Sequence, residues 1–298
     1  MGRLVGAYAT SHTAMIIRKF QPDNDVHAAV HEAFDQVRAE VDRLAPDVLV
    51  VIGSEHLNSF GYDSFPQICV GIGETATGWG DGGVASAELP LAGAFAAQLL
   101  ADGVAAGFDL AFSANPKIDH AFMAPLTLIR PEMDIPVVPV FQNASTEPLP
   151  PLWRCAQLGE LLRDVIGRRP AVERVVVLGT GGLSHWVGTP EMGQINVDFD
   201  EAFLEDVQAG DLDSILAMKT ADVLAEAGNG APEIRNWVTA MAAATAGESR
   251  AASESGQGPG QAAGRTSRTP RGVVLAYRSV PDWATGIALA RLFPEQEP

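Results

Sequence analysis

The chain has 298 residues, of which 47% are hydrophobic and 19% charged, so it can form one large α/β domain or two smaller ones. Its formal net charge of −17 argues against sequence-independent binding to nucleic acids or to anionic membranes, because both require a cationic surface. Two cysteines without CxxC spacing, with no evident signal peptide and no apolar run long enough to cross a bilayer, predict a cytoplasmic protein.

Predicted strands and helices alternate through the first part of the chain. In order, we expect a strand over residues 4–10, a helix over 25–44, strands over 48–52 and 68–72, a glycine-rich loop over 78–83, a helix over 90–102, strands over 109–113 and 137–141, a helix over 153–166 and a strand over 174–178. The run 48–52 has five branched apolar residues without polar alternation, which is typical of a parallel strand buried on both faces. We expect a loop carrying Asp119 and His120 after the strand 109–113.

The last third of the chain changes character twice. Residues 196–246 have a helical pattern, and their last helix begins near Glu233, just after Pro232, which suits a first-turn position. Residues 247–271 contain no aliphatic side chain larger than alanine and cannot bury enough apolar area to fold, so we predict a disordered insertion there. Residues 272–293 are apolar again and are expected to pack back on the body of the protein.

This pattern predicts a single domain, residues 1–298, of the α/β class, with a central mostly parallel sheet flanked by helices. Four of the six histidines fall at or shortly after predicted strand ends: His12, His56, His120 and His185. The carboxyl ends of parallel strands share one edge of the sheet, where ligands bind, so these side chains should converge there. A single histidine at a strand end is more often a loop or capping residue, but four on one edge favour a site.

Two neutral imidazoles and one carboxylate on one face of a metal form the triad of non-haem Fe(II) oxygenases, and Zn(II) competes for the same ligands. The remaining two histidines, His27 and His31, are spaced i, i+4 on a predicted helix. Because the sequence between them lacks the HExxH pattern and no third ligand is evident, we expect them to lie on a solvated helix face.

Several short motifs stand out along the chain: Ser11-His12, Glu55-His56-Leu-Asn-Ser-Phe60, Asp119-His120, Gly179-Thr-Gly-Gly-Leu-Ser-His185, Ile195-Asn-Val-Asp-Phe-Asp200 and the helix that begins near Glu233. Together they resemble the class III (type II) extradiol ring-cleavage dioxygenases, a group that includes the β subunit of protocatechuate 4,5-dioxygenase and 2,3-dihydroxyphenylpropionate dioxygenase. They occur in the family's order along most of the chain. Two departures are Glu55, where the family commonly has Asp, and the insertion 247–271.

The resemblance implies a single catalytic domain in which His12, His56 and Glu233 hold Fe(II). Glu226, only seven residues before Glu233, is the competing carboxylate. The implied reaction cleaves a catechol ring beside its two hydroxyls and inserts both atoms of O2. His185 would take a proton from the substrate and later return one, and His120 would hydrogen-bond the substrate hydroxyl or oxygen.

The resemblance also implies the binding partners, which are O2 and a catecholic substrate that is carboxylated in many relatives. We expect the protein to bind neither nucleic acid nor a membrane. A homo-oligomer is expected, and a small second subunit is an alternative because some relatives need one. Arg18, Lys19, Lys117 and Arg278 are candidates, by position only, for binding a substrate carboxylate. Two other functions stay open: a non-catalytic relative that binds a ligand or partner, and a Zn(II) hydrolase that uses a metal-bound water.

Overall fold

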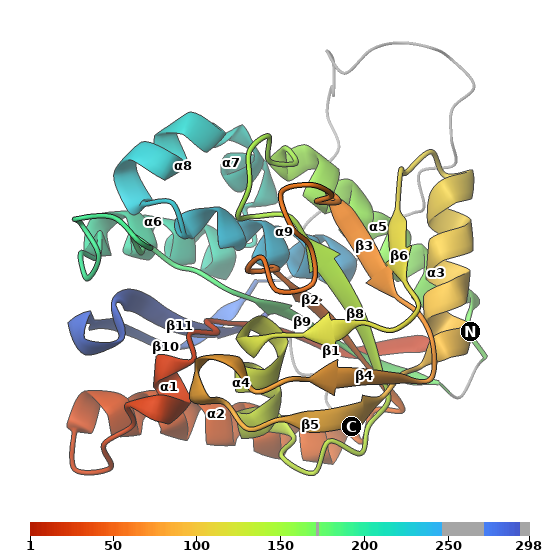
Figure 1. Ribbon diagram of the computed structural model, residues 1–298, viewed down its shortest axis with the longest axis horizontal. Coiled ribbons are helices and arrows are strands. Elements are labelled where there is room, and N and C mark those ends of the chain that lie inside the picture. Colours follow the sequence, from red (N-terminus) through yellow and green to blue (C-terminus); the bar gives the residue numbers. More distant parts are fainter. Residues whose placement is uncertain (171–172, 246–270, 293–298) are drawn as a thin grey trace.

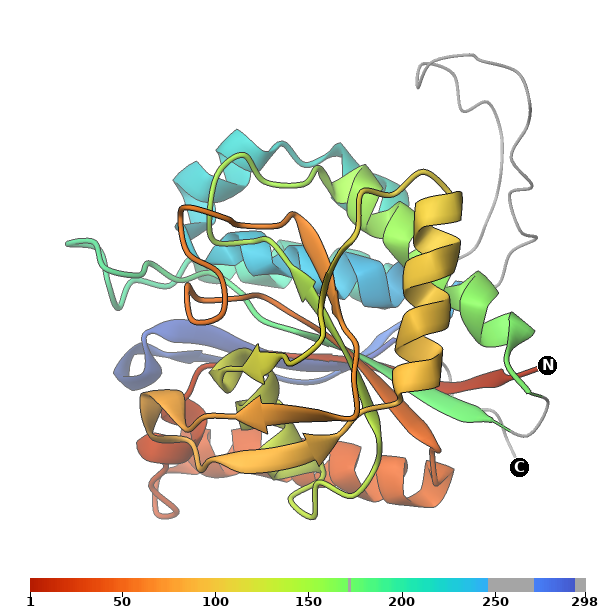
Figure 2. The same ribbon diagram turned by 45° about the vertical axis from the view of Figure 1, so that its right-hand side comes forward.

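The computed structural model describes residues 1–170, 173–245 and 271–292, and within these ranges the main sheet has eight strands in the order β10-β11-β1-β9-β2-β8-β3-β6. The strands are β1 (Arg3–Thr10), β2 (Val48–Gly53), β3 (Ile68–Gly71), β6 (Ala111–Ser113), β8 (Val137–Gln142), β9 (Arg174–Thr180), β10 (Val273–Val280) and β11 (Thr285–Arg291). The sheet runs through the middle of the molecule, with helices on both sides (Figures 1 and 2).

The centre of the sheet is parallel. Strand β9 pairs in parallel with both β1 and β2, and β2 pairs in parallel with β8. All six residues of β2 are buried, as the unbroken apolar run predicted. The carboxyl ends of these four strands therefore lie at one edge of the sheet, and the predicted α/β fold with a mostly parallel sheet is confirmed.

Alternate residues of the central strands face two separate hydrophobic cores. On one face, Val50 and Ile52 of β2 pack in a core with α3 (Gly93–Ala105), α5 (Leu152–Arg168), α6 (Val197–Ala209) and α9 (Ile234–Ala244). On the other face, Leu49 and Val51 pack in a core with α2 (Asp25–Leu44) and α4 (His120–Ile129). This alternation is the two-residue period of a strand covered on both sides.

Short elements complete the fold. A second sheet has the order β5-β4-β7, built from β4 (Thr75–Gly78), β5 (Ala87–Pro90) and β7 (Lys117–Ile118). The remaining helices are α1 (Met15–Arg18), α7 (Leu212–Ala217), α8 (Thr220–Ala227) and the 3-10 turns η1 (Asp81–Gly83), η2 (Ala231–Glu233) and η3 (Pro281–Trp283). Among the described residues, no helix has both the length and the apolar character that a bilayer crossing requires.

Most predicted elements agree with the structure to within a few residues. Helix 25–44 has the predicted bounds, and Asn24 caps it by accepting hydrogen bonds from two backbone N–H groups of the first turn. The predicted helix 90–102 instead begins at Gly93, because residues 87–90 pair with β4. The described part of the segment 272–293 packs back on the body: β10 and β11 form a hairpin, and β11 pairs antiparallel with β1. The predicted insertion 247–271 lies, except for its last residue, outside the described residues.

The expectation of a solvated face for His27 and His31 is wrong. His27 is 2% exposed, and its ring stacks on Trp283 with centroids 4.3 Å apart. The ring of His31 stacks on Phe20, and its Nε2 donates to the carbonyl of Ile16 at 2.9 Å. The hairpin β10–β11 and its turn η3 bring Trp283 over the helix, and that contact between distant segments could not be read from the helix alone.

Candidate active site and metal centre

His12, His56 and Glu233 come together at the carboxyl edge of the central strands. His12 follows β1, His56 follows β2, and Glu233 is the last residue of η2, directly before α9. The Nε2 atoms of His12 and His56 lie 2.9 Å and 3.1 Å from the same carboxylate oxygen, Oε1 of Glu233. His12 and Glu233 are 4% and 3% exposed, so these two side chains are shielded from bulk water, whereas the His56 side chain is 28% exposed.

The outer nitrogens of the two imidazoles are held by partners that accept hydrogen bonds. Thr180 Oγ1 donates to the carbonyl of Ala121 at 2.8 Å, so it is left to accept from Nδ1 of His12 at 3.2 Å. Nδ1 of His56 lies 3.0 Å from Oδ2 of Asp119, which is an acceptor. When both Nδ1 atoms carry the proton, both Nε2 atoms turn lone pairs toward Glu233. The two Nε2 atoms and Oε1 of Glu233 are then three electron-rich atoms that lie close together. A bound cation fits such a group of donor atoms.

The electrostatics of the three residues agree with a positive charge at that point. Burial lowers the pKa of His12, which favours its neutral form. Burial also disfavours the charged form of His56, but the carboxylates of Asp119 and Glu233 outweigh it and raise the pKa of His56 well above its usual range. Burial alone would raise the pKa of Glu233, yet the neighbouring His12 and His56 hold it well below its ordinary value. A bound divalent metal would supply the positive charge that a proton otherwise supplies.

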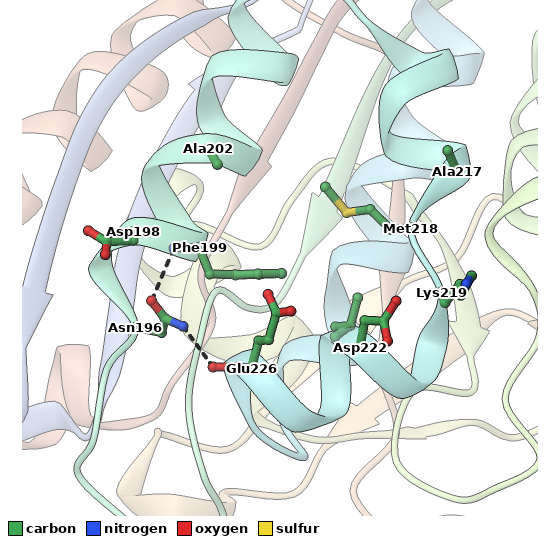
Figure 3. Close-up of a pocket in the computed structure, with 10 residues that line it drawn as sticks. Asn196, Asp198, Phe199, Ala202, Ala217, Met218, Lys219, Asp222 and Glu226 are labelled. Carbon is green, nitrogen blue, oxygen red and sulfur yellow. Dashed lines mark hydrogen bonds between the residues drawn. The ribbon is translucent and has the colours of Figure 1, made fainter.

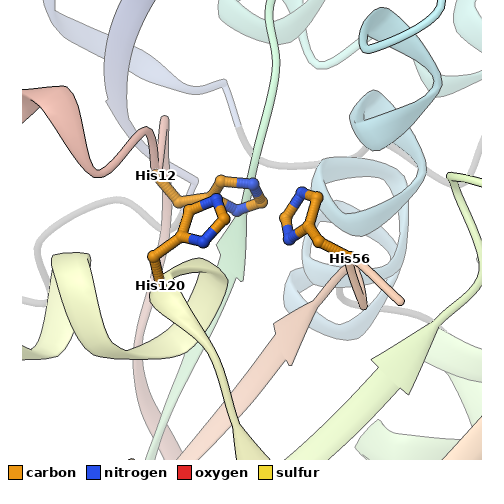
Figure 4. Close-up of side chains that lie close together, drawn as sticks. All are labelled: His12, His56 and His120. Carbon is orange, nitrogen blue, oxygen red and sulfur yellow. The ribbon is translucent and has the colours of Figure 1, made fainter. Parts of the chain in front are cut away.

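His120 completes a group of three imidazoles. Side chains of His12, His56 and His120 point toward one another in Figure 4, and one ring nitrogen from each lies within 4.8 Å of the others. The rings of His56 and His120 are stacked, with centroids 4.4 Å apart. The predicted loop position of His120 is wrong: it is the first residue of α4, because the Asp119 side chain caps that helix by accepting from the N–H of Ala121. Its Nδ1 is hydrogen-bonded to Asp81.

His185 lies beside this cluster. Its Nδ1 donates to the carbonyl of Leu183 at 2.9 Å, so its Nε2 carries a lone pair, which lies 3.9 Å from Oε2 of Glu233 and accepts no hydrogen bond from the described residues. Gly230 allows this position, because a Cβ there would lie only 2.0 Å from Nε2 of His185. The ring is half-buried, which suits a group that exchanges protons with a substrate.

The loop that carries His185 is anchored by a buried carboxylate. Asp200 accepts from the N–H of Ser184 at 2.8 Å, from the Ser184 hydroxyl at 2.9 Å and from the Tyr277 hydroxyl at 2.9 Å. Its side chain is fully buried, and that burial raises its pKa to about 6 from an ordinary value of 3.8. Asp200 thus fixes the residue next to His185 from α6, and Tyr277 links the same carboxylate to the C-terminal hairpin.

We expect Asp200→Asn to change the pH dependence of folding. The folded state binds a proton at Asp200 more tightly than the unfolded chain does, so this group lowers the free energy of unfolding as the pH rises through its folded pKa of about 6. The difference between the two pKa values corresponds to about 3 kcal/mol. Urea unfolding between roughly pH 3 and pH 7 should therefore show the wild type losing about that much stability relative to the variant. Parallel stability curves for the two proteins would contradict this assignment.

The two acidic candidates near the C-terminal helix have different surroundings. Glu233 contacts His12 and His56, as described above. Glu226 is exposed on α8 and lines a hollow of about 470 Å³ between α6, α7 and α8, together with Phe199, Met218 and Lys219 (Figure 3). The geometry therefore groups Glu233, and not Glu226, with the two histidines.

The four proposed carboxylate-binding cations do not converge in the structure. Arg18 and Lys19 line a hollow of about 480 Å³ with His27 and Asp282, and Lys19 Nζ donates to the carbonyl of Asp282 at 3.1 Å. Arg278 donates to the carbonyl of Tyr277. Lys117 lies nearest to the site along the chain, two residues before Asp119, and its carbonyl accepts from the Ser59 hydroxyl of the loop that follows His56.

Several residues that build the site were not identified from the sequence. Asp81, which holds His120, comes from the glycine-rich loop 78–83, and Thr180, which holds His12, is the last residue of β9. Asn236 of α9 donates to Ser54 and to the carbonyl of Thr180, the residue that contacts His12. Their positions in the sequence gave a weak indication. Thr180 lies within the motif that runs from Gly179 to His185, and Asp81 lies in the glycine-rich loop 78–83.

Comparisons with known proteins agree on one family. Residues 6–265 match the family described as the catalytic LigB subunit of aromatic ring-opening dioxygenase. The chain is 28% identical to a 2,3-dihydroxyphenylpropionate/2,3-dihydroxicinnamic acid 1,2-dioxygenase of Burkholderia vietnamiensis, with 90% of each chain covered. It is 30% identical to the protein of that name from a Rhodococcus species, covering 81% of this chain and 90% of the relative. The protein of that name from Klebsiella pneumoniae is 27% identical, with 94% and 95% covered.

A solved structure shares the fold. The crystal structure of an uncharacterized protein from Escherichia coli K12 superposes with a TM-score of 0.58, covering 97% of this chain and 99% of that chain. Because the sequence identity is 13%, this likeness concerns the architecture alone.

Proposed function

The chain belongs to the LigB family of aromatic ring-opening dioxygenases and is a ring-cleaving dioxygenase of catechol-type substrates; from this premise we propose that it works with Fe(II) held by His12, His56 and Glu233. The observation that carries the proposal is the convergence of two imidazole Nε2 atoms on one carboxylate oxygen, at 2.9 Å and 3.1 Å. Two imidazoles and one carboxylate form the donor set of non-haem Fe(II) oxygenases.

When bound, Fe(II) would supply open positions at which the two catechol oxygens and O2 are brought together. The protein would contribute the proton transfers. His185, with its Nε2 lone pair free, would accept the proton of a substrate hydroxyl and return a proton as the ring expands to a lactone. Hydrolysis of that lactone gives a ring-opened semialdehyde.

His120 would bind the substrate rather than the metal. Its Nδ1 is engaged by Asp81, so the opposite nitrogen is left to accept a hydrogen bond from a substrate hydroxyl. Asp119 would hold both the ring and the backbone N–H of His56, at 3.0 Å and 3.1 Å. These supporting hydrogen bonds keep ligand imidazoles in one tautomer and one orientation.

The names of the relatives support a narrower proposal for the substrate. The three relatives are named for 2,3-dihydroxyphenylpropionate and 2,3-dihydroxicinnamic acid, catechols that carry a carboxylated side chain. We therefore propose a carboxylated catechol for this chain as well. The net charge of this chain is −17, which repels a substrate carboxylate, so a nearby cation has to offset that repulsion. Lys117 is the candidate beside the site.

Reconstitution with metal tests this proposal directly. Metal-free protein loaded anaerobically with Fe(II) and then given O2 should consume O2 and form a yellow ring-opened product from catechols with a carboxylated side chain. The same protein loaded with Zn(II) should do neither. Catechol cleavage by metal-free protein would refute the metal centre, and hydrolysis without O2 uptake in the Zn(II) sample would favour the hydrolase alternative.

Assembly stays a prediction. We propose a homo-oligomer, with pairing to a small second subunit as the alternative that the family resemblance brings. Light scattering on the purified chain, followed by an activity assay without any added subunit, distinguishes these two cases.

A further inference from the structure

We infer that Asp81 is a positioning residue, which fixes His120 so that its free nitrogen faces the bound catechol; this inference rests on the proposed role of His120. Asp81 and His120 are 39 residues apart in the sequence, and the carboxylate Oδ2 of Asp81 is hydrogen-bonded to Nδ1 of His120. Their side chains are only 10% and 22% exposed, so this contact is shielded from competing water.

The glycine-rich loop is shaped to deliver Asp81. It connects β4 to β5, and Gly80 and Gly82, on either side of Asp81, have φ values of 87° and 61°, a conformation that side chains with a Cβ rarely adopt. At Gly82 a Cβ would also lie 2.6 Å from the Cβ of Ala14. The loop therefore packs against the segment that follows His12. This contact gives a role to the glycine-rich loop 78–83, which the proposed metal ligands do not explain.

The hydrogen bond selects one tautomer of His120. A carboxylate can only accept, so Nδ1 must carry the proton, and Nε2 is left as an acceptor. The ring itself is placed by stacking on His56 at 4.4 Å and by an edge contact with His12 at 5.8 Å. Rotation about χ2 would otherwise exchange the two nitrogens, and the carboxylate of Asp81 prevents that exchange.

A second metal site at Asp81, Asp119 and His120 is the competing interpretation, since one ligand atom of each lies within 4.8 Å of the others. The hydrogen bonds that Asp119 already accepts argue against a second metal site. Its Oδ1 accepts from the N–H of Ala121, and its Oδ2 accepts from the backbone and ring of His56 and from Asn58. Oδ1 of Asp81 is buried and accepts no hydrogen bond from the described residues, so Asp81 acts on His120 through Oδ2 alone.

The test compares Asp81→Asn with the matched control Glu88→Gln. Glu88 is an exposed carboxylate on β5 of the same small sheet, where it accepts from the Thr77 hydroxyl. With Fe(II) loaded, we expect Asp81→Asn to lower kcat roughly 10- to 100-fold, the usual cost of losing such a support. Iron content and thermal unfolding should match the wild type, KM should change by less than about threefold, and Glu88→Gln should behave as wild type throughout.

A double-mutant cycle with His120→Gln shows whether Asp81 acts through His120. If it does, Asp81→Asn should cause no further loss in the His120→Gln background. Additive losses, or loss of iron in Asp81→Asn, would overturn the inference. If His120→Gln alone leaves kcat unchanged, the proposed role of His120 fails. If His120→Gln lowers kcat while Asp81→Asn does not, only the inference about Asp81 fails.

Discussion

Replacing Glu233 with glutamine is expected to abolish iron binding and ring cleavage together. The substitution keeps the size of the side chain but removes the negative charge at the point where Nε2 of His12 and Nε2 of His56 converge. Loss of a partner around a ligand already costs about 10- to 100-fold in metal affinity, so loss of the anionic ligand itself should cost on the order of 100-fold or more. Metal analysis after anaerobic Fe(II) loading, with O2 uptake on the same sample, measures both effects.

The chain supplies a matched control seven residues earlier. Glu226 is exposed on α8, in the hollow between α6 and α8, so Glu226→Gln should retain iron and activity. The variant Glu233→Gln should remain folded, because a buried carboxylate that has lost its cation is costly and its neutral isostere is not. If Glu226→Gln lost iron while Glu233→Gln kept it, the carboxylate ligand would have been assigned wrongly.

Sequence reasoning identified the fold and the residues that follow central strands. The apolar run 48–52 predicts a strand buried on both faces, and the strand order β1-β9-β2-β8 brings the ends of these strands to one edge. His12, His56 and His185 follow three of these strands, so the rule that ligands bind at the carboxyl edge locates them without coordinates. The bounds of helix 25–44 could be predicted equally well, because they depend on local capping.

Residues held by non-local packing could not be identified in this way. Asp81 reaches His120 through the small sheet, in which β4 pairs in parallel with the two-residue strand β7, too short to leave a pattern in the sequence. His27 stacks on Trp283, which the turn η3 brings onto it from more than 250 residues later in the chain. Asp200 lies in a quoted motif, but its contact with Ser184 depends on how α6 folds back over the loop after β9.

Replacing His185 should separate metal binding from catalysis. Nε2 of His185 is 3.9 Å from Oε2 of Glu233, whereas the imidazoles of His12 and His56 reach Oε1 within 3.1 Å, so we place His185 beside the proposed metal centre and outside the proposed ligand set. The variant His185→Gln should therefore load Fe(II) as the wild type does. Its kcat should fall roughly 10²- to 10⁴-fold, the range that general acid–base catalysis supplies, with little change in KM.

The contrast with Glu233→Gln gives this prediction its meaning. One variant should be inactive because it lacks iron, and the other should be inactive with a full complement of iron and a bound catechol. An imidazole exchanges protons near neutral pH and an amide does not, so the lost activity should not return at any pH that leaves the protein folded. A His185→Gln protein that turned over catechol at the wild-type rate would show that another group moves the substrate proton, and His120, held by Asp81, would be the next candidate.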